Sequence, residues 1–232
     1  MDSRMDRLSS MGIDVWKPRF NPPFAYQDDY VLEAATQELP ILSPPMEAIP
    51  DWGELEATVK DCCRCPLHET RTQTVFGVGS RSAQWMFIGE APGEQEDIKG
   101  EPFVGRAGQL LDEMIKAIGL SREEVYIANV LKCRPPKNRD PSPEEASACE
   151  SYLLSQIILV KPSILIAVGR IAAQHLLKTT VPIGKLRGSV HDYRSIPLVV
   201  TYHPAYLLRS QTEKRRAWED LKLARRVLCG QL

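Results

Sequence analysis

The sequence lacks the features that would place the protein in or across a membrane. No apolar run in its 232 residues approaches the length of a membrane span. The N-terminus has charges at Asp2, Arg4, Asp6 and Arg7 and no apolar stretch of the kind that a secretory signal requires. We therefore expect a cytoplasmic protein, in a compartment where thiols such as those of its six cysteines are kept reduced.

A strong net charge is also absent. The formal net charge is −1, but residues 1–61 hold 12 acidic and 5 basic residues, whereas the remainder holds 18 acidic and 24 basic residues. The body of the protein is therefore moderately basic. Such a body permits a nucleic-acid partner without requiring one.

The first 50 residues lack a sustained apolar period. They contain seven of the 18 prolines, and this composition predicts a largely extended tail rather than part of a core. One segment of it, Met11–Trp16, carries large apolar side chains that can dock on the body or on a protein partner. The ordered domain is expected to span residues 51–232, a length that can bury a full core, and to be a monomer.

Beyond residue 50, short apolar runs alternate with helical patterns. The runs at residues 85–88, 125–128, 164–168 and 198–201 are typical of buried strands. Capping signatures occur at Asp51–Glu54, Ser121–Glu124 and Ser142–Glu145, and a last amphipathic helix uses Trp218, Leu221 and Leu228. Strands that alternate with helices predict an α/β fold, here a three-layer α/β/α sandwich with a central four-stranded parallel sheet.

The strand expected at residues 85–88 leads into a glycine-rich loop. Gly89 and the pair Pro92-Gly93 favour a tight turn. The segment then carries four carboxylates and one aromatic ring, at Glu90, Glu94, Glu96, Asp97 and Phe103. Because open α/β sheets bind ligands at the carboxyl ends of their strands, this loop is a candidate site. Taken alone, it is equally compatible with a solvated acidic surface.

Four of the six cysteines have a spacing typical of a metal site. Cys62 and Cys65 form a CxxC pair, Cys133 follows after 67 further residues and Cys149 after 15 more. Sulfur donors suit zinc or an iron–sulfur cluster, and no histidine lies at ligand spacing among them. Zinc ribbons usually have two tight CxxC pairs, so the wide second pair favours a [4Fe–4S] cluster. The alternative is a set of ordinary buried thiols, the role we assign to the other two cysteines.

These pieces occur together in one known family. The chain resembles the family-four uracil-DNA glycosylases of bacteria and archaea, which carry a four-iron cluster, over roughly residues 52 to 228. The matching motifs are Gly89–Gly93, Pro102–Gly108, Asn129–Pro135, His203–Ala205 and the four cysteines in order. Each motif alone is weak, whereas five in the same order are specific.

The resemblance implies an enzyme that flips uracil out of DNA and cuts its N-glycosidic bond, leaving an abasic site in base excision repair. Phe103 then offers a stacking face, and Ala91 is part of the substrate pocket. Asn129 is the expected reader of the uracil edge, because its amide has both a donor and an acceptor. Cytosine presents the opposite pattern at the same atoms and would be rejected.

The resemblance also suggests catalytic residues. His203 lies where the family's motif places a donor to the leaving base, whose negative charge grows in the transition state. The group that activates water stays open, because Ala91 stands where family-one enzymes have the aspartate of a Gly-Gln-Asp-Pro-Tyr motif. Glu90 or Glu96 can orient water or stabilise the sugar cation. Alternatively, a dissociative transition state needs no strong base.

DNA contacts are expected on the basic stretches. Lys132 and Arg134 flank a cluster ligand, and Arg209 follows the His-Pro turn, with Leu207 expected to fill the gap left by the flipped base. Two rival functions are a uracil-DNA binder that traps DNA covalently, as a related subgroup does, and a non-catalytic iron–sulfur or zinc DNA-binding module. The trapping subgroup has a histidine-bearing insertion where this chain has Pro135–Pro141 without histidine.

Overall fold

A computed structural model describes residues 51–230 of the chain. The tail predicted for residues 1–50 lies outside these residues. Within residues 51–230, the structure contains no helix with the length and apolarity needed to cross a membrane.

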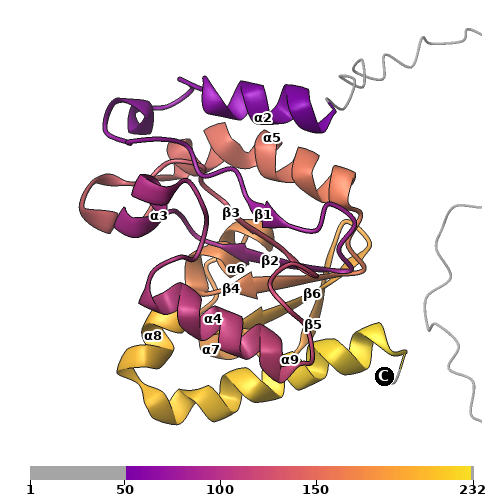
Figure 1. Cartoon of the computed structure of the whole chain (residues 1–232). Helices are drawn as coiled ribbons and strands as arrows, with labels where there is room; N and C mark the ends of the chain where they lie inside the picture. The colour runs from indigo at the N-terminus through magenta and orange to yellow at the C-terminus, as the bar shows by residue number, and fades with distance from the viewer. Residues whose placement is uncertain (1–50, 231–232) are drawn as a thin grey trace, which may run out of the picture. The chain divides into compact units, whose positions relative to one another are not determined.

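A single mixed sheet forms the centre of this part of the chain (Figure 1). Its strands are β1 (Val78–Gly79), β2 (Trp85–Gly89), β3 (Tyr126–Asn129), β4 (Ile164–Val168), β5 (Val190–Tyr193) and β6 (Ile196–Thr201). They lie in the order β1-β3-β2-β4-β6-β5. The inner four strands pair in parallel, which confirms the expected four-stranded core.

The two outer strands were not expected, and both pair antiparallel with their neighbours. Strand β1 has only two residues. Strand β5 is exposed and half-buried at alternating positions, so neither strand has the continuous apolar run that marks a buried strand.

Helices flank the sheet on both faces (Figure 1). They are α2 (Trp52–Lys60), α3 (Glu94–Lys99), α4 (Arg106–Ala117), α5 (Pro143–Val160), α6 (Arg170–Leu176), α7 (Ile183–Leu186), α8 (Pro204–Arg209) and α9 (Lys214–Leu228). Short 3-10 turns lie at η1 (Pro66–Glu69), η2 (Pro136–Asn138) and η3 (Gln211–Glu213).

Each face of the sheet has its own core. On one face, Phe87 and Val199 pack with Leu111 of α4 and Leu221 of α9. On the other, Met86 and its neighbours pack with the apolar residues of α5 and α6. Alternate strand residues thus face opposite helical layers, and the three-layer α/β/α sandwich is confirmed.

The capping signatures had different outcomes. Asp51 with Glu54, and Ser142 with Glu145, both form complete capping boxes at the starts of α2 and α5. At Ser121, the backbone N–H donates to the Glu124 carboxylate at 2.7 Å, but a turn rather than a helix forms. The chain enters β3 only two residues after Glu124, so no length remains for a helix to propagate.

Trp218 was expected to face the core from the last helix, but its side chain is 37% exposed. Leu221 is buried as expected, and Leu228 packs against the same core cluster. The apolar face of α9 is thus narrower than the sequence pattern suggested.

Candidate active site

A cleft of about 470 Å³ opens at the carboxyl ends of the central strands. Strand β2 ends at Gly89 and β3 at Asn129, and their connections continue to opposite sides of the sheet. Such a switch point is where open α/β sheets bind ligands. All six residues expected in catalysis or substrate binding line this cleft, namely Glu90, Ala91, Glu96, Phe103, Asn129 and His203.

Phe103 is held on one wall of the cleft in an unusual backbone conformation. Its φ of 55° lies in the left-handed region, which few non-glycine residues adopt. Two glycines leave room for it: a Cβ on Gly89 would lie 2.6 Å from the Phe103 ring, and a Cβ on Gly108 would collide with the Phe103 carbonyl. The ring centroid lies 5.6 Å from that of His203. The motif glycines therefore bring an aromatic face next to the histidine.

Asn129 presents an unsatisfied acceptor to the cleft. The residue is 2% exposed, and its Oδ1 atom has no hydrogen-bond partner among the described residues. A buried acceptor without a partner is costly unless a ligand supplies a donor. This position therefore fits a ligand that carries an N–H group.

Glu96 organises the loop that carries Phe103. Its Oε1 atom accepts hydrogen bonds from the backbone N–H groups of Val104 at 2.9 Å and Gly105 at 3.0 Å. Asp97, which the sequence placed on the same acidic loop, is buried and accepts from the backbone N–H of Thr72. Part of the expected acidic loop is in fact the helix α3. Two of its carboxylates accept hydrogen bonds from backbone N–H groups.

Glu90 is a partly buried carboxylate beside a second acidic group. Burial, and secondly the negative charge of Asp140, raise the pKa of Glu90 to about 7, while Arg170 acts in the opposite direction. Arg170 and Asp140 form an ion pair with an N–O distance of 2.6 Å. The sequence reasoning missed both residues, although Arg170 follows the end of β4 and lies at the same edge of the sheet.

His203 has a defined tautomer. It caps the N-terminus of α8, where its Nδ1 atom accepts the backbone N–H of Ala205 at 3.1 Å. Burial, with a further contribution from Arg209, lowers the pKa of His203 to about 4, so the ring is neutral at pH 7. Because Nδ1 accepts, the single ring proton resides on Nε2. The neutral ring is therefore a hydrogen-bond donor at Nε2.

Two of the residues expected to contact DNA are buried. Lys132 is 1% exposed, and its ammonium group donates to the Asn129 carbonyl at 2.8 Å and to Gln156 Oε1 at 2.7 Å. Leu207 is likewise 1% exposed and packs in the core below α8. Both expectations are wrong, because each side chain points inward: Lys132 stands between the buried Leu131 and Cys133, and Leu207 faces the core from α8. Arg134 is half-buried and Arg209 exposed, so these two are available to a ligand.

The expected metal ligands lie on segments that the fold brings together. Cys133 and Cys149 are buried side by side, and Cys65 packs against them. Burial raises the pKa of Cys133 to about 11, although Arg71 donates to its sulfur at 3.0 Å. Without a bound metal the thiol is therefore protonated.

The chemistry of these residues favours a cluster over a single metal ion. In residues 51–230, no group of three or more His, Cys, Asp or Glu side chains is arranged to hold a metal ion. A four-iron cluster spaces its thiolate ligands more widely than one ion does, and the donor set of cysteines without carboxylates fits soft metal chemistry. Cys63 and Cys229, the two cysteines expected to be ordinary buried thiols, are exposed, so that expectation is wrong.

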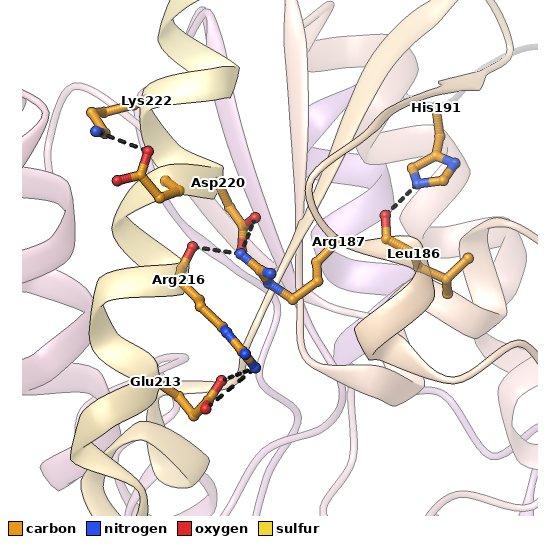
Figure 2. Close-up of polar contacts among 8 residues, drawn as sticks. Leu186, Arg187, His191, Glu213, Arg216, Asp220 and Lys222 are labelled. Carbon is orange, nitrogen blue, oxygen red and sulfur yellow. Dashed lines mark hydrogen bonds and ion pairs between the residues drawn. The ribbon is translucent and has the colours of Figure 1, made fainter.

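The end of β6, which leads to His203, is supported by a buried ion pair. Arg187 donates to the two carboxylate oxygens of Asp220 at 2.8 and 3.1 Å, and to the carbonyl of Arg216 at 2.7 Å (Figure 2). Asp220 is fully buried. The Arg187 guanidinium also lies over the ring of Tyr202, 5.2 Å from its centroid. This network fixes the residue that precedes His203.

The family is established by comparison with known proteins. The model of the Uracil DNA glycosylase superfamily matches residues 76–222. The type-4 uracil-DNA glycosylase of Archaeoglobus fulgidus is 42% identical over 193 residues, which cover 80% of this chain and 95% of that protein. The type-4 uracil-DNA glycosylase of Thermotoga maritima is 46% identical over 171 residues, covering 72% and 89%. The type-5 enzyme of Pyrobaculum aerophilum is 31% identical over 170 residues. With its cleft and its motifs in register, this chain belongs to the uracil DNA glycosylase superfamily, in the type-4 branch.

Proposed function

We propose that the protein excises uracil from DNA by hydrolysing its N-glycosidic bond, as a repair enzyme. The observation that carries this proposal is the unsatisfied Asn129 acceptor, which lies in one cleft with Phe103 and His203. A base inside a duplex is unreachable, so the nucleotide has to be flipped into such a cleft. Membership of the family supports the same reaction.

Recognition follows from the chemistry of the pocket. The Asn129 Oδ1 atom accepts the N3–H of uracil, its amide nitrogen donates to O4, and Phe103 stacks on the base. Cytosine has an acceptor at N3 and a donor at N4, so it leaves both amide atoms of Asn129 unpaired. A site of this kind rejects the wrong base strongly, because its buried polar groups lose their partners.

Bond cleavage requires charge stabilisation on two sides. As the bond between C1′ and N1 breaks, negative charge grows on the base, and the Nε2–H of His203 is the donor to O2. A donor aimed at developing charge contributes roughly 10²- to 10³-fold in rate. The oxygen of a water molecule then bonds to C1′ and loses a proton, which we assign to Glu90, a cleft-lining carboxylate whose pKa is raised to about 7. Glu96 is engaged with the backbone, so we assign it a positioning role.

We further propose that Cys62, Cys65, Cys133 and Cys149 hold a [4Fe–4S] cluster. Such a cluster would act structurally, by tying the segments around η1, the loop after β3 and helix α5 to one another. Arg134 and Arg209 would contact DNA phosphates near the cleft. The need for reduced thiols fits a cytoplasmic location.

One assay tests the reaction. The protein is incubated with a single-uracil oligonucleotide, the DNA is treated with alkali, and strand cleavage is measured. Cleavage at uracil, and none with cytosine or thymine at that position, is the expected result. A complex with DNA that survives denaturation without release of uracil would support the covalent-trapping alternative. DNA binding without either product would support a non-catalytic module.

A further inference from the structure

A second cleft of about 480 Å³ adjoins the first. Both are lined by Glu90, His203, Ala205 and Arg209, so one begins where the other ends. The proposed recognition of uracil uses only the first cleft. The second therefore has the position of a neighbouring subsite without an assigned ligand.

Tyr206 is the aromatic residue that α8 presents to this second cleft. Its side chain is 38% exposed, whereas the next residue, Leu207, points into the core. Its ring centroid lies 5.1 Å from that of Tyr202, with an angle of 43° between the planes. An exposed aromatic ring beside a cleft offers a face on which a planar ligand can stack.

The ring beneath Tyr206 is held rigidly. Tyr202 is mostly buried and is covered by the Arg187 guanidinium, which is fixed in turn by the fully buried Asp220 (Figure 2). Tyr206 packs against this immobilised ring. The protein therefore loses little side-chain conformational entropy when a ligand stacks on Tyr206.

The remaining lining combines apolar and cationic groups. Ile171 and Ile183 contribute apolar surface, and Arg170 and Arg209 contribute guanidinium groups. Arg170 pairs with Asp140, whereas no carboxylate among residues 51–230 forms an ion pair with Arg209. An aromatic face, an apolar wall and a cation together match a nucleotide, whose base stacks and whose phosphate is anionic.

We propose that this second cleft binds the nucleobase next to the target uracil on the same strand. The base stacks on Tyr206, and an adjoining phosphate contacts Arg209. This inference rests on the proposed uracil excision. This mode of binding differs from the insertion of a protein side chain into the duplex. Here the neighbouring base itself leaves the helical stack and enters the protein. The affinity of the protein for single-stranded DNA should therefore depend on that base.

The test removes the base and the ring separately. Single-stranded oligonucleotides with one uracil are prepared with an intact neighbour or with a stable abasic analogue on either side. Their affinities are measured by fluorescence anisotropy for the parent, Tyr206→Ala and Tyr206→Phe. Trp218→Ala is the matched control, because Trp218 is exposed to nearly the same extent but lies outside both clefts.

We expect that loss of one neighbouring base weakens binding to the parent about tenfold, within the range measured for base–aromatic stacking. The same loss should change binding to Tyr206→Ala less than threefold, while Tyr206→Phe and Trp218→Ala behave as the parent. Equal sensitivity of the parent and Tyr206→Ala would overturn the inference. So would an effect of Tyr206 confined to duplex DNA, which would indicate insertion into the helix. Excision of the unmodified substrate is scored separately, so its failure would refute the proposed function and not the subsite.

Discussion

The pH dependence of cleavage is the sharpest consequence of the cleft's electrostatics. Burial and the charge of Asp140 raise the pKa of Glu90 to about 7. If the ionised carboxylate assists the attack of water, the ionised fraction falls from about one half at pH 7 to about 1% at pH 5. The single-turnover rate should then fall roughly 50-fold over this interval. A carboxylate with an ordinary pKa would change the rate less than about twofold.

Replacing the charged neighbours of Glu90 should shift the midpoint of the rate profile in opposite directions. Asp140→Asn removes the charge that raises the pKa of Glu90, so the midpoint of the rate profile should move to lower pH. Arg170→Gln removes an opposing positive charge, so the midpoint should move to higher pH. Glu90→Gln should abolish the inflection near pH 7 in the rate profile. Glu94→Gln, which changes an exposed carboxylate on the same segment, is the control and should leave the midpoint in place.

The assay is single-turnover cleavage of one oligonucleotide at saturating protein between pH 5 and 8. His203 adds no step in this range, because its pKa of about 4 keeps it neutral throughout. The raised pKa of Glu90 also affects the free energy of unfolding. The folded state binds the Glu90 proton more tightly than the unfolded state, so stability should fall as pH rises from 4.5 to 7, and Glu90→Gln should remove that contribution. A flat rate profile in the parent, or midpoints unchanged by both neighbour variants, would refute this account.

Three further outcomes are expected. His203→Ala should slow single-turnover cleavage about 10²- to 10³-fold, more than Glu96→Gln at equal DNA occupancy, because it removes the donor to the departing base; a slower Glu96→Gln would reverse the ranking. Asn129→Asp should weaken excision of uracil and admit some cytosine, since a carboxyl presents different donors and acceptors; cleavage of uracil at the parent rate would exclude Asn129 as the reader. Anaerobically purified protein should contain iron and acid-labile sulfide, and Cys133→Ser should lose both, together with DNA affinity; one zinc per chain without iron would contradict the cluster.

Much of the fold was accessible from the sequence because its signals are local. The largely apolar runs that became β2, β3, β4 and β6 can be recognised without knowing their partners, since a strand covered on both faces is apolar over most of its length. Capping boxes such as Ser142 with Glu145 span a few residues and depend on backbone groups close in sequence. The cleft residues were identified from motifs, of which those with Glu90, Asn129 and His203 lie at the end of such a strand and that with Phe103 precedes α4.

The direction in which individual side chains point was decided only by the tertiary structure. Lys132 and Leu207 occur in stretches that suit DNA binding, yet both are buried, because the helical and loop geometry turns them inward while Arg134 and Tyr206 face outward. The same holds for Asp220, whose carboxylate is buried against Arg187, a residue 33 positions away in sequence. Pairs that distant leave no periodic signal. The sequence by itself determined which elements form and which motifs end them, and the packing of those elements decided which of their side chains can reach a ligand.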